Sequence, residues 1–198
     1  KNLSQWSKGE YASANNTQAD TQIIADNHNT VGFRLDDYGN TVDNASYLEI
    51  FPDDSVKNDG TITTPNDFDV LIFTTTGGQA DLKIEPESMG PNLDLLAELY
   101  DSNNTLLLSS NPDTDLTATL SANLNAGSYT VRVSGVGRGD VLGNGYSDYG
   151  SLGTYAITGT VTGGEQATRF SIAENPSSGA SLGTVSPRND HGIDSLSY

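Results

Sequence analysis

Two aspartates one residue apart open the most apolar run of the sequence. Asp67 and Asp69 belong to the stretch NDFDVLIFTTT, immediately before Val70. Aspartate is depleted in β-strands, and residues i and i+2 of an extended strand point to the same face. Two neighbouring carboxylates beside an apolar strand raise each other's pKa or destabilise the site unless a cation neutralises them. The pair therefore predicts a metal site that ties a preceding loop to this strand.

A second acidic stretch, DDYGN, precedes the first and supplies Asp36, Asp37 and Asn40. Calcium takes about six to eight oxygen ligands from carboxylates, amides and backbone carbonyls. Asp, Asn and Gly are also ordinary turn residues, so each stretch alone fits a solvated turn equally well. The two stretches together favour calcium, although the twelve-residue EF-hand loop pattern is absent.

Two further clusters of acids and amides are better explained as turns and solvated charge. They lie in PNLDLLAELYD and GNGYSDYGSLG and contain Asn92, Asp94, Asp101, Asn144, Asp148 and Ser151.

Catalytic motifs are missing from the sequence. His28 and His191 lie far apart, no H-E-x-x-H is present, and GYSDYG does not match the G-x-S-x-G nucleophile elbow. Paired carboxylates serve glycosidases, but nothing selects one pair here. Tyr146, Tyr149 and Tyr155 are candidates for a sugar-binding surface, although Tyr155 alternates with Ile157 as a core residue does.

Composition limits the partners and the compartment. The 198 residues include 26 acidic and 9 basic side chains, a formal net charge of −17, which argues against nucleic acid and anionic membrane surfaces. No apolar run approaches the about 18 residues of a membrane span, and no signal peptide is visible. The absence of cysteine, together with 21 glycines, many Asn, Thr and Ser residues and the strong acidity, fits a secreted bacterial protein, whereas a small secreted eukaryotic domain more often carries disulfides. We expect a monomer without membrane insertion.

The elements that must position the acids are predicted to be β-strands. Short runs rich in Val, Ile, Leu, Thr and Tyr recur, and in SYTVRVSG the residues Tyr129, Val131 and Val133 alternate with polar ones. The turn sequences predicted to separate these runs are DDYGN, KNDG, TTGG, DSNN, NAGS and GNG, and VGFRL and ASYLEIF are among the predicted strands. The prediction is an all-β, jelly-roll-like β-sandwich.

The two ends of the chain read differently. ADTQIIADN places Ala19, Ile23 and Ile24 at helical spacing, so residues 1–30 are predicted to be a short, partly helical lead-in. Residues 31–163 form the predicted sandwich, and residues 164–198 resemble the start of another β module that is cut short. Because residue 1 is Lys, we expect a processed or excised piece of a longer protein.

The ordered succession of motifs in residues 31–163 resembles bacterial pre-peptidase C-terminal domains. The motifs are DDYGNTVDNASYL, NDFDVLIFTTT, NLDLLAELYDSNNTLLLSS, LNAGSYTVRVSG and GTYAITGTV. The resemblance implies a non-catalytic β-sandwich carried behind a secreted peptidase domain. Some relatives, collagenase collagen-binding domains among them, bind Ca²⁺ through the two acidic motifs. Carried over, this implicates Asp36, Asp37, Asn40, Asp67 and Asp69, with Asp standing where some relatives have Glu.

The flanks resemble two other families. QWSKGEYASANNTQADTQIIAD is similar to the segment behind the catalytic core of reprolysin-like zinc metallopeptidases, whose zinc-binding helix would lie upstream of Lys1. FSIAENPSSGASLGTV is similar to the first strands of a cadherin-like repeat, in which Glu174 would be a calcium ligand.

Three functions remain open. The first is a calcium-binding accessory module of a secreted metallopeptidase that aids stability and attachment to substrate or matrix. The second is a carbohydrate-binding or adhesin module of a multidomain surface protein, with extracellular polysaccharide or a matrix protein as partner. The third, an independent hydrolase, lacks a nucleophile or metal triad.

Overall fold

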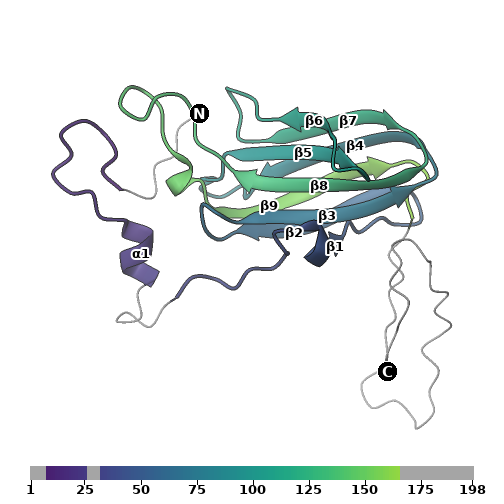
Figure 1. Ribbon diagram of the computed structural model, residues 1–198, viewed down its shortest axis with the longest axis horizontal. Helices are drawn as coiled ribbons and strands as arrows, with labels where there is room; N and C mark the ends of the chain where they lie inside the picture. The colour runs from purple at the N-terminus through teal and green to yellow at the C-terminus, as the bar shows by residue number, and fades with distance from the viewer. Residues whose placement is uncertain (1–7, 26–31, 166–198) are drawn as a thin grey trace, which may run out of the picture. The chain divides into compact units, whose positions relative to one another are not determined.

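Two stacked β-sheets form the body of the protein (Figure 1). The computed structural model describes residues 8–25 and 32–165. The strands are β1 (Ser46–Tyr47), β2 (Ser55–Ile62), β3 (Phe68–Thr75), β4 (Gly78–Pro86), β5 (Leu95–Asp101), β6 (Leu106–Ser110), β7 (Ala118–Leu124), β8 (Gly127–Gly135) and β9 (Gly153–Val161). The short helices are α1 (Asp20–Ala25) and the 3₁₀ turns η1 (Val42–Asn44) and η2 (Asp148–Gly150).

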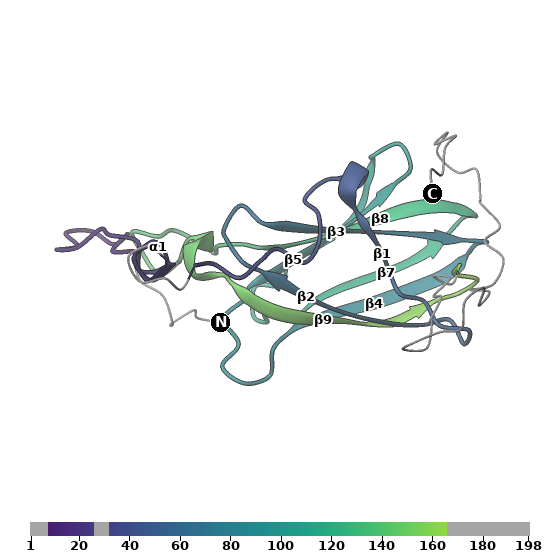
Figure 2. The same cartoon turned by 90° about the horizontal axis from the view of Figure 1, so that it is seen from below.

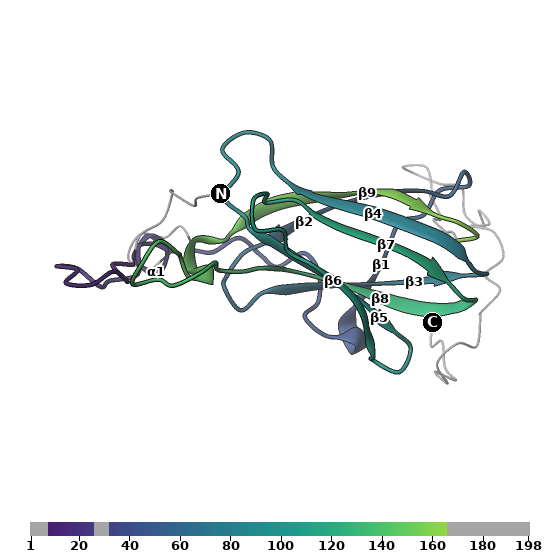
Figure 3. The same cartoon turned by 90° about the horizontal axis from the view of Figure 1, so that it is seen from above.

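The strand order is that of a jelly roll. One sheet has the order β1-β3-β8-β5-β6 and the other the order β2-β9-β4-β7. From β2 onward the antiparallel pairs are nested, since β2 pairs with β9, β3 with β8, β4 with β7 and β5 with β6. Figures 2 and 3 show the two sheets as separate layers. The prediction of an all-β, jelly-roll-like sandwich is confirmed.

Alternating side chains build the core between the sheets. In β8, Tyr129, Val131 and Val133 are buried as the sequence predicts, and in β4 the inward residues are Ala80, Leu82 and Ile84. Phe73 stacks on Tyr129 with ring centroids 5.6 Å apart. Apolar burial of this kind stabilises the sandwich by about 25 cal/mol per Å², so the sheets form a firm base for the acidic residues at the start of β3.

Three local predictions are wrong. KNDG is not a turn, because residues 57–60 lie inside β2 and pair with β9. Of VGFRL, residues 32–35 form no strand, and only Ser46 and Tyr47 of ASYLEIF belong to one. Polar and glycine residues in β2 face inward for specific purposes: the Asn58 side chain accepts from the Glu49 backbone, and Gly60 makes room for Tyr155.

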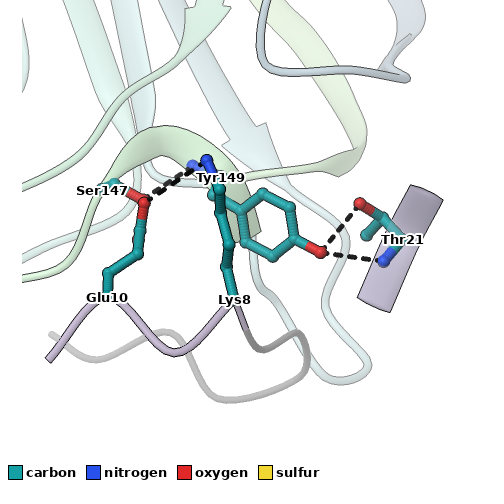
Figure 4. A network of polar contacts seen from close by, with 5 residues as sticks. All are labelled: Lys8, Glu10, Thr21, Ser147 and Tyr149. Atoms are coloured by element: carbon teal, nitrogen blue, oxygen red, sulfur yellow. Dashed lines mark hydrogen bonds and ion pairs between the residues drawn. The ribbon is translucent and has the colours of Figure 1, made fainter. Parts of the chain in front are cut away.

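The predicted helix is present as α1, but it buries no residue, and Ile23 and Ile24 are exposed. The lead-in contacts the sandwich at η2 instead (Figure 4). The Tyr149 hydroxyl accepts hydrogen bonds from the backbone N–H and the Oγ1 of Thr21, at 2.8 and 3.0 Å. Ser147 donates to Glu10, and Lys8 Nζ lies 5.5 Å from the centre of the Tyr149 ring.

The predicted division into residues 1–30, 31–163 and 164–198 stays a prediction. All described residues belong to one compact unit, and their strands run from Ser46 to Val161. The cadherin-like stretch and Glu174 lie outside the described residues. In the part of the chain that the structure describes, no helix is long and apolar enough to cross a membrane.

Candidate metal centre

The fold brings the two acidic stretches together at the start of β3. Carboxylate oxygens of Asp36, Asp37 and Asp69 lie within 4.8 Å of one another. Two oxygens bound to the same Ca²⁺ at about 2.3–2.6 Å lie at most about 5 Å apart. This acidic triad can therefore bind one metal ion with its oxygens near their present positions.

Two buried carboxylate oxygens at the site have no hydrogen-bond donor among the described residues. They are Oδ1 of Asp67 and Oδ1 of Asp69. Asp67 is 4% exposed and Asp69 is fully buried. Leaving a buried acceptor unpaired costs about 1–3 kcal/mol, and more when it is charged. A bound cation would satisfy such oxygens.

The remaining oxygens of these two aspartates are held in place. Asp67 Oδ2 accepts from the Thr63 backbone at 2.6 Å and from the Thr63 hydroxyl at 2.8 Å, which fixes the turn between β2 and β3. Asp69 Oδ2 accepts from the Tyr155 hydroxyl at 2.6 Å. Each side chain is therefore oriented by one oxygen while its other oxygen stays unpaired.

The acidic loop, residues 36–40, is attached to the strands by its backbone and by Asn40. The Gly39 carbonyl accepts from the Val70 N–H at 3.1 Å, and Asn40 Oδ1 accepts from the Phe68 N–H at 2.7 Å. Asp37 Oδ1 accepts a longer bond, 3.3 Å, from the Thr61 N–H. Gly39 is required sterically, since a Cβ there would lie 2.2 Å from the Asn44 carbonyl oxygen.

The site places the buried carboxyl of Asp69 beside the solvent-exposed carboxylates of Asp36 and Asp37. The pKa of the Asp69 carboxyl is raised to about 8, chiefly by burial and also by the charges of Asp37, Asp67 and Asp36, against the lowering effect of the Tyr155 hydrogen bond. Burial also raises the pKa of Asp37 and, together with Asp69, that of Tyr155. No described lysine or arginine forms an ion pair with these acids. The metal-free site therefore keeps Asp69 protonated near neutral pH.

A hollow of about 560 Å³ opens beside the triad, and Asp37, Thr61 and Tyr155 are among its lining residues. Of the three acids of the cluster, only Asp37 lines this hollow.

The five predicted ligands differ in their geometry. Asp36, Asp37 and Asp69 form the cluster. Asp67 lies outside it, and its buried Oδ1 has no hydrogen-bond donor among the described residues. Asn40 already uses its oxygen to accept from Phe68. The assignment of all five as ligands stays a prediction.

Sequence reasoning missed Tyr155 as part of the site. Its ring is buried, as the alternation with Ile157 indicates, but its hydroxyl donates a hydrogen bond to Asp69. The available signal was Gly60, because a glycine inside a strand often marks a close approach. Gly60 stands opposite Tyr155 in the ladder, and a Cβ on it would lie 2.4 Å from the tyrosine hydroxyl.

The other acidic clusters have structural roles. Asp94 is fully buried and both of its oxygens are paired, with Oδ1 accepting from Asn111 at 2.8 Å and Oδ2 from the Tyr146 hydroxyl at 2.6 Å. Asp101 Oδ1 accepts from two backbone N–H groups in the β5–β6 turn. The proposed tyrosine surface does not form, since Tyr149 and Tyr155 are buried.

The fold and site thus define a jelly-roll β-sandwich with an acidic cluster at one strand. No family model matches the chain, and no curated protein matches it. Among solved structures, the pre-peptidase C-terminal domain of collagenase from Bacillus anthracis is similar, with 13% identity over 60% of this chain and 97% of that one, at a TM-score of 0.42. PliG of Aeromonas hydrophila, a periplasmic inhibitor of g-type lysozyme, is 12% identical over 58% of this chain and 94% of that one, at a TM-score of 0.38. Both TM-scores lie below 0.5, so neither similarity assigns this chain to a family.

Proposed function

We propose that this chain is a non-catalytic, calcium-binding accessory module of a secreted bacterial metallopeptidase. In this proposal one Ca²⁺ joins the acidic loop to β3 and stabilises the module, which aids attachment of the parent enzyme to its substrate or matrix. The module acts outside the cell as a monomer.

One observation carries the metal part of the proposal. Asp67 and Asp69 each bury an oxygen without a donor among the described residues, and Asp69 clusters with the carboxylates of Asp36 and Asp37. A structural carboxylate in the same protein, Asp94, has both oxygens paired. Because buried polar groups are normally paired, the two unpaired oxygens favour a cation-binding site over a simple turn.

Calcium fits the donor set better than other common ions. All candidate donors are oxygens, and the chain has no cysteine, which disfavours zinc and softer metals. The carboxylates come from a loop and a strand, and Ca²⁺ accepts irregular oxygen coordination whereas Mg²⁺ requires near-ideal octahedral coordination.

The accessory role is supported by the motif succession in residues 31–163 and by the scarcity of catalytic residues. In the sequence, His28 and His191 lie far apart and no H-E-x-x-H is present. A net charge of −17 suits an extracellular module that remains soluble.

Thermal unfolding of the full chain in millimolar CaCl₂, in MgCl₂ and in excess chelator tests the proposal. A ligand that binds the native state alone adds about 2.7 kcal/mol to the free energy of unfolding at a hundredfold excess over Kd. We expect the melting temperature to rise by several degrees in calcium, and less in magnesium.

Two variants assign the effect. Asp69→Asn removes a charge at the site and should abolish the calcium-dependent rise. Asp113→Asn removes a charge at an exposed position and should leave the rise intact. An equal melting temperature in calcium and chelator for the unmodified chain would overturn the metal site.

A further inference from the structure

A second hollow lies on the outer face of the five-stranded sheet. Its volume is about 180 Å³, and its floor includes Thr130 and Arg132 of β8. These residues alternate with the buried Val131 and Val133, so they point away from the core. Asn40 and Val42 line one side, and Tyr100 and Asn104 line the other. We call this hollow the trough.

Both walls of the trough are held by hydrogen bonds. On one side Asn40 accepts from the Phe68 N–H. On the other side Asp101 accepts from the Asn103 and Thr105 N–H groups, and Asn104 adopts a positive φ of 59° in the same turn. Fixed walls reduce the entropy that a ligand must overcome on binding.

The chemistry of the trough is polar and nearly neutral. Its side chains offer amides from Asn40 and Asn104, the hydroxyl of Thr130, the ring of Tyr100 and the apolar Val42, which is 51% exposed. The one cation, Arg132, is already engaged: its guanidinium lies 3.9 Å from the centre of the Phe68 ring and 3.9 Å from a Glu98 oxygen.

We propose that the trough binds a neutral polysaccharide. A sugar ring presents an apolar C–H face, which fits the Tyr100 ring and Val42, and hydroxyls, which pair with the amides of Asn40 and Asn104 and the hydroxyl of Thr130. The net charge of −17 repels polyanions, and the trough offers no unpaired carboxylate to a cationic ligand. The neutral sugar polymer is the ligand class that both the charge and the lining fit.

The size of the trough points to a polymer. Pockets that engulf a small molecule measure about 300–1,000 Å³, and the trough is smaller and open. Its size and open shape fit a short stretch of a polymer chain that crosses the sheet.

The trough and the metal centre share the acidic loop. Asp36 and Asp37 stand at one end of residues 36–40, and Asn40 at the other end forms part of the trough wall. This step rests on the proposed calcium function: an ion that fixes the loop also fixes the wall. We therefore expect weaker polysaccharide binding in chelator.

The experiment measures binding of the full chain to cellohexaose, xylohexaose and chitohexaose by calorimetry, with alginate oligomer and gelatin as contrasting probes. We expect binding to at least one neutral oligomer in calcium and none to alginate. Tyr100→Ala should weaken it tenfold or more, and Asn104→Asp, which tolerates the positive φ, should weaken it as well. Tyr47→Ala is the matched control, because Tyr47 is 69% exposed on the same sheet outside the trough.

The outcomes separate this inference from the proposed function. Failure of every neutral oligomer to bind, or binding to gelatin alone, overturns the trough proposal even when calcium raises the melting temperature. Oligomer binding that Tyr47→Ala abolishes as strongly as Tyr100→Ala also overturns it. Oligomer binding that depends on Tyr100, without any effect of calcium on melting or affinity, upholds the trough and overturns the metal site and its coupling.

Discussion

Tyr155 in β9 and Asp69 in β3 lie on different sheets, and the tyrosine hydroxyl donates a 2.6 Å hydrogen bond to Asp69 Oδ2 across the interior. The bond orients the carboxylate so that Oδ1 stays buried without a donor. The cross-sheet contact thereby links the core of the sandwich to the candidate metal centre.

Removal of this hydroxyl should weaken calcium binding. A hydrogen bond to a charged acceptor is worth about 1.5–3 kcal/mol and a neutral one about 0.5–1.5 kcal/mol. Asp69 is ionised with the metal bound and protonated without it, so Tyr155→Phe should raise the Kd for Ca²⁺ about five- to tenfold. Calorimetric titration measures the change. Tyr129→Phe, which removes a hydroxyl bound to the Asn125 carbonyl, should leave the Kd unchanged.

Gly60→Ala should disturb the same hydrogen bond from the opposite strand. A Cβ at residue 60 would lie 2.4 Å from the Tyr155 hydroxyl, which must then move. We expect both a lower melting temperature in chelator and a weaker calcium response. Gly127→Ala is the matched control, because its Cβ would meet only a ring carbon of Tyr129 at 3.9 Å and the Tyr129 hydroxyl at 4.0 Å. Equal behaviour of the two variants would contradict the tight fit at Gly60.

The metal-free protein should lose stability as the pH rises. Burial raises the folded-state pKa of Asp69 from 3.8 to about 8, so the folded state holds this proton more tightly than the unfolded state does. The contribution to the free energy of unfolding is fully present below the unfolded pKa and is lost progressively until the pH passes the folded pKa. Urea unfolding in chelator between about pH 6 and about pH 8 should show this decline.

Asp69→Asn should flatten that decline in stability, because the asparagine side chain does not titrate in this pH range. Calcium should also remove it in the unmodified protein, because the bound ion keeps Asp69 ionised. A pH slope in chelator that is the same for the variant and the unmodified chain would show that another group causes it.

Asp94→Ala should destabilise the protein independently of calcium. The change removes the acceptor of the Tyr146 hydroxyl and one of the two acceptors of the Asn111 amide, which keeps the Leu95 carbonyl. A buried polar group left unpaired costs about 1–3 kcal/mol. The difference between calcium and chelator melts should stay as in the unmodified protein. A smaller calcium-dependent rise in melting temperature would show that Asp94 affects metal binding and would contradict its purely structural role.

Tyr149→Phe should loosen the lead-in without affecting the sandwich. Its hydroxyl accepts both hydrogen bonds from Thr21, and the phenylalanine ring keeps the apolar packing. We expect faster amide exchange in residues 20–25 and an unchanged melting temperature, both measurable on the full chain. Protection in residues 20–25 equal to that of the unmodified chain would show that other contacts hold α1.

Strand identity was predictable wherever alternation and turn residues agreed, as in β8 and at the NAGS turn before it. The prediction was wrong in β2, where Asn58 and Gly60 look like turn residues but face inward. Both residues are explained by tertiary contacts. The Asn58 side chain accepts a hydrogen bond from the Glu49 backbone N–H, and a side chain at position 60 would collide with Tyr155. Local propensity contains neither fact.

The site was predictable in part. The acids of the acidic loop and of β3 were predicted to converge, and the structure places Asp36 and Asp37 beside Asp69. The role of Tyr155 was not predictable, because it depends on a contact between residues 86 positions apart in the chain. The opposite roles of Asp67 and Asp94, one with an unpaired oxygen and one fully paired, also follow from neighbours that sequence spacing does not reveal.

The nesting of β2 against β9 has a mechanical consequence. Ser55, where β2 begins, stands opposite Thr160 near the end of β9, so tension along the chain would open this ladder from one end, one pair at a time. The acidic loop precedes β2, and a cation that fastens Asp36 and Asp37 to Asp69 receives the load before Ser55 does. If the proposed Ca²⁺ is bound there, it would bear part of the applied force, and the force needed to unfold the module should increase with calcium.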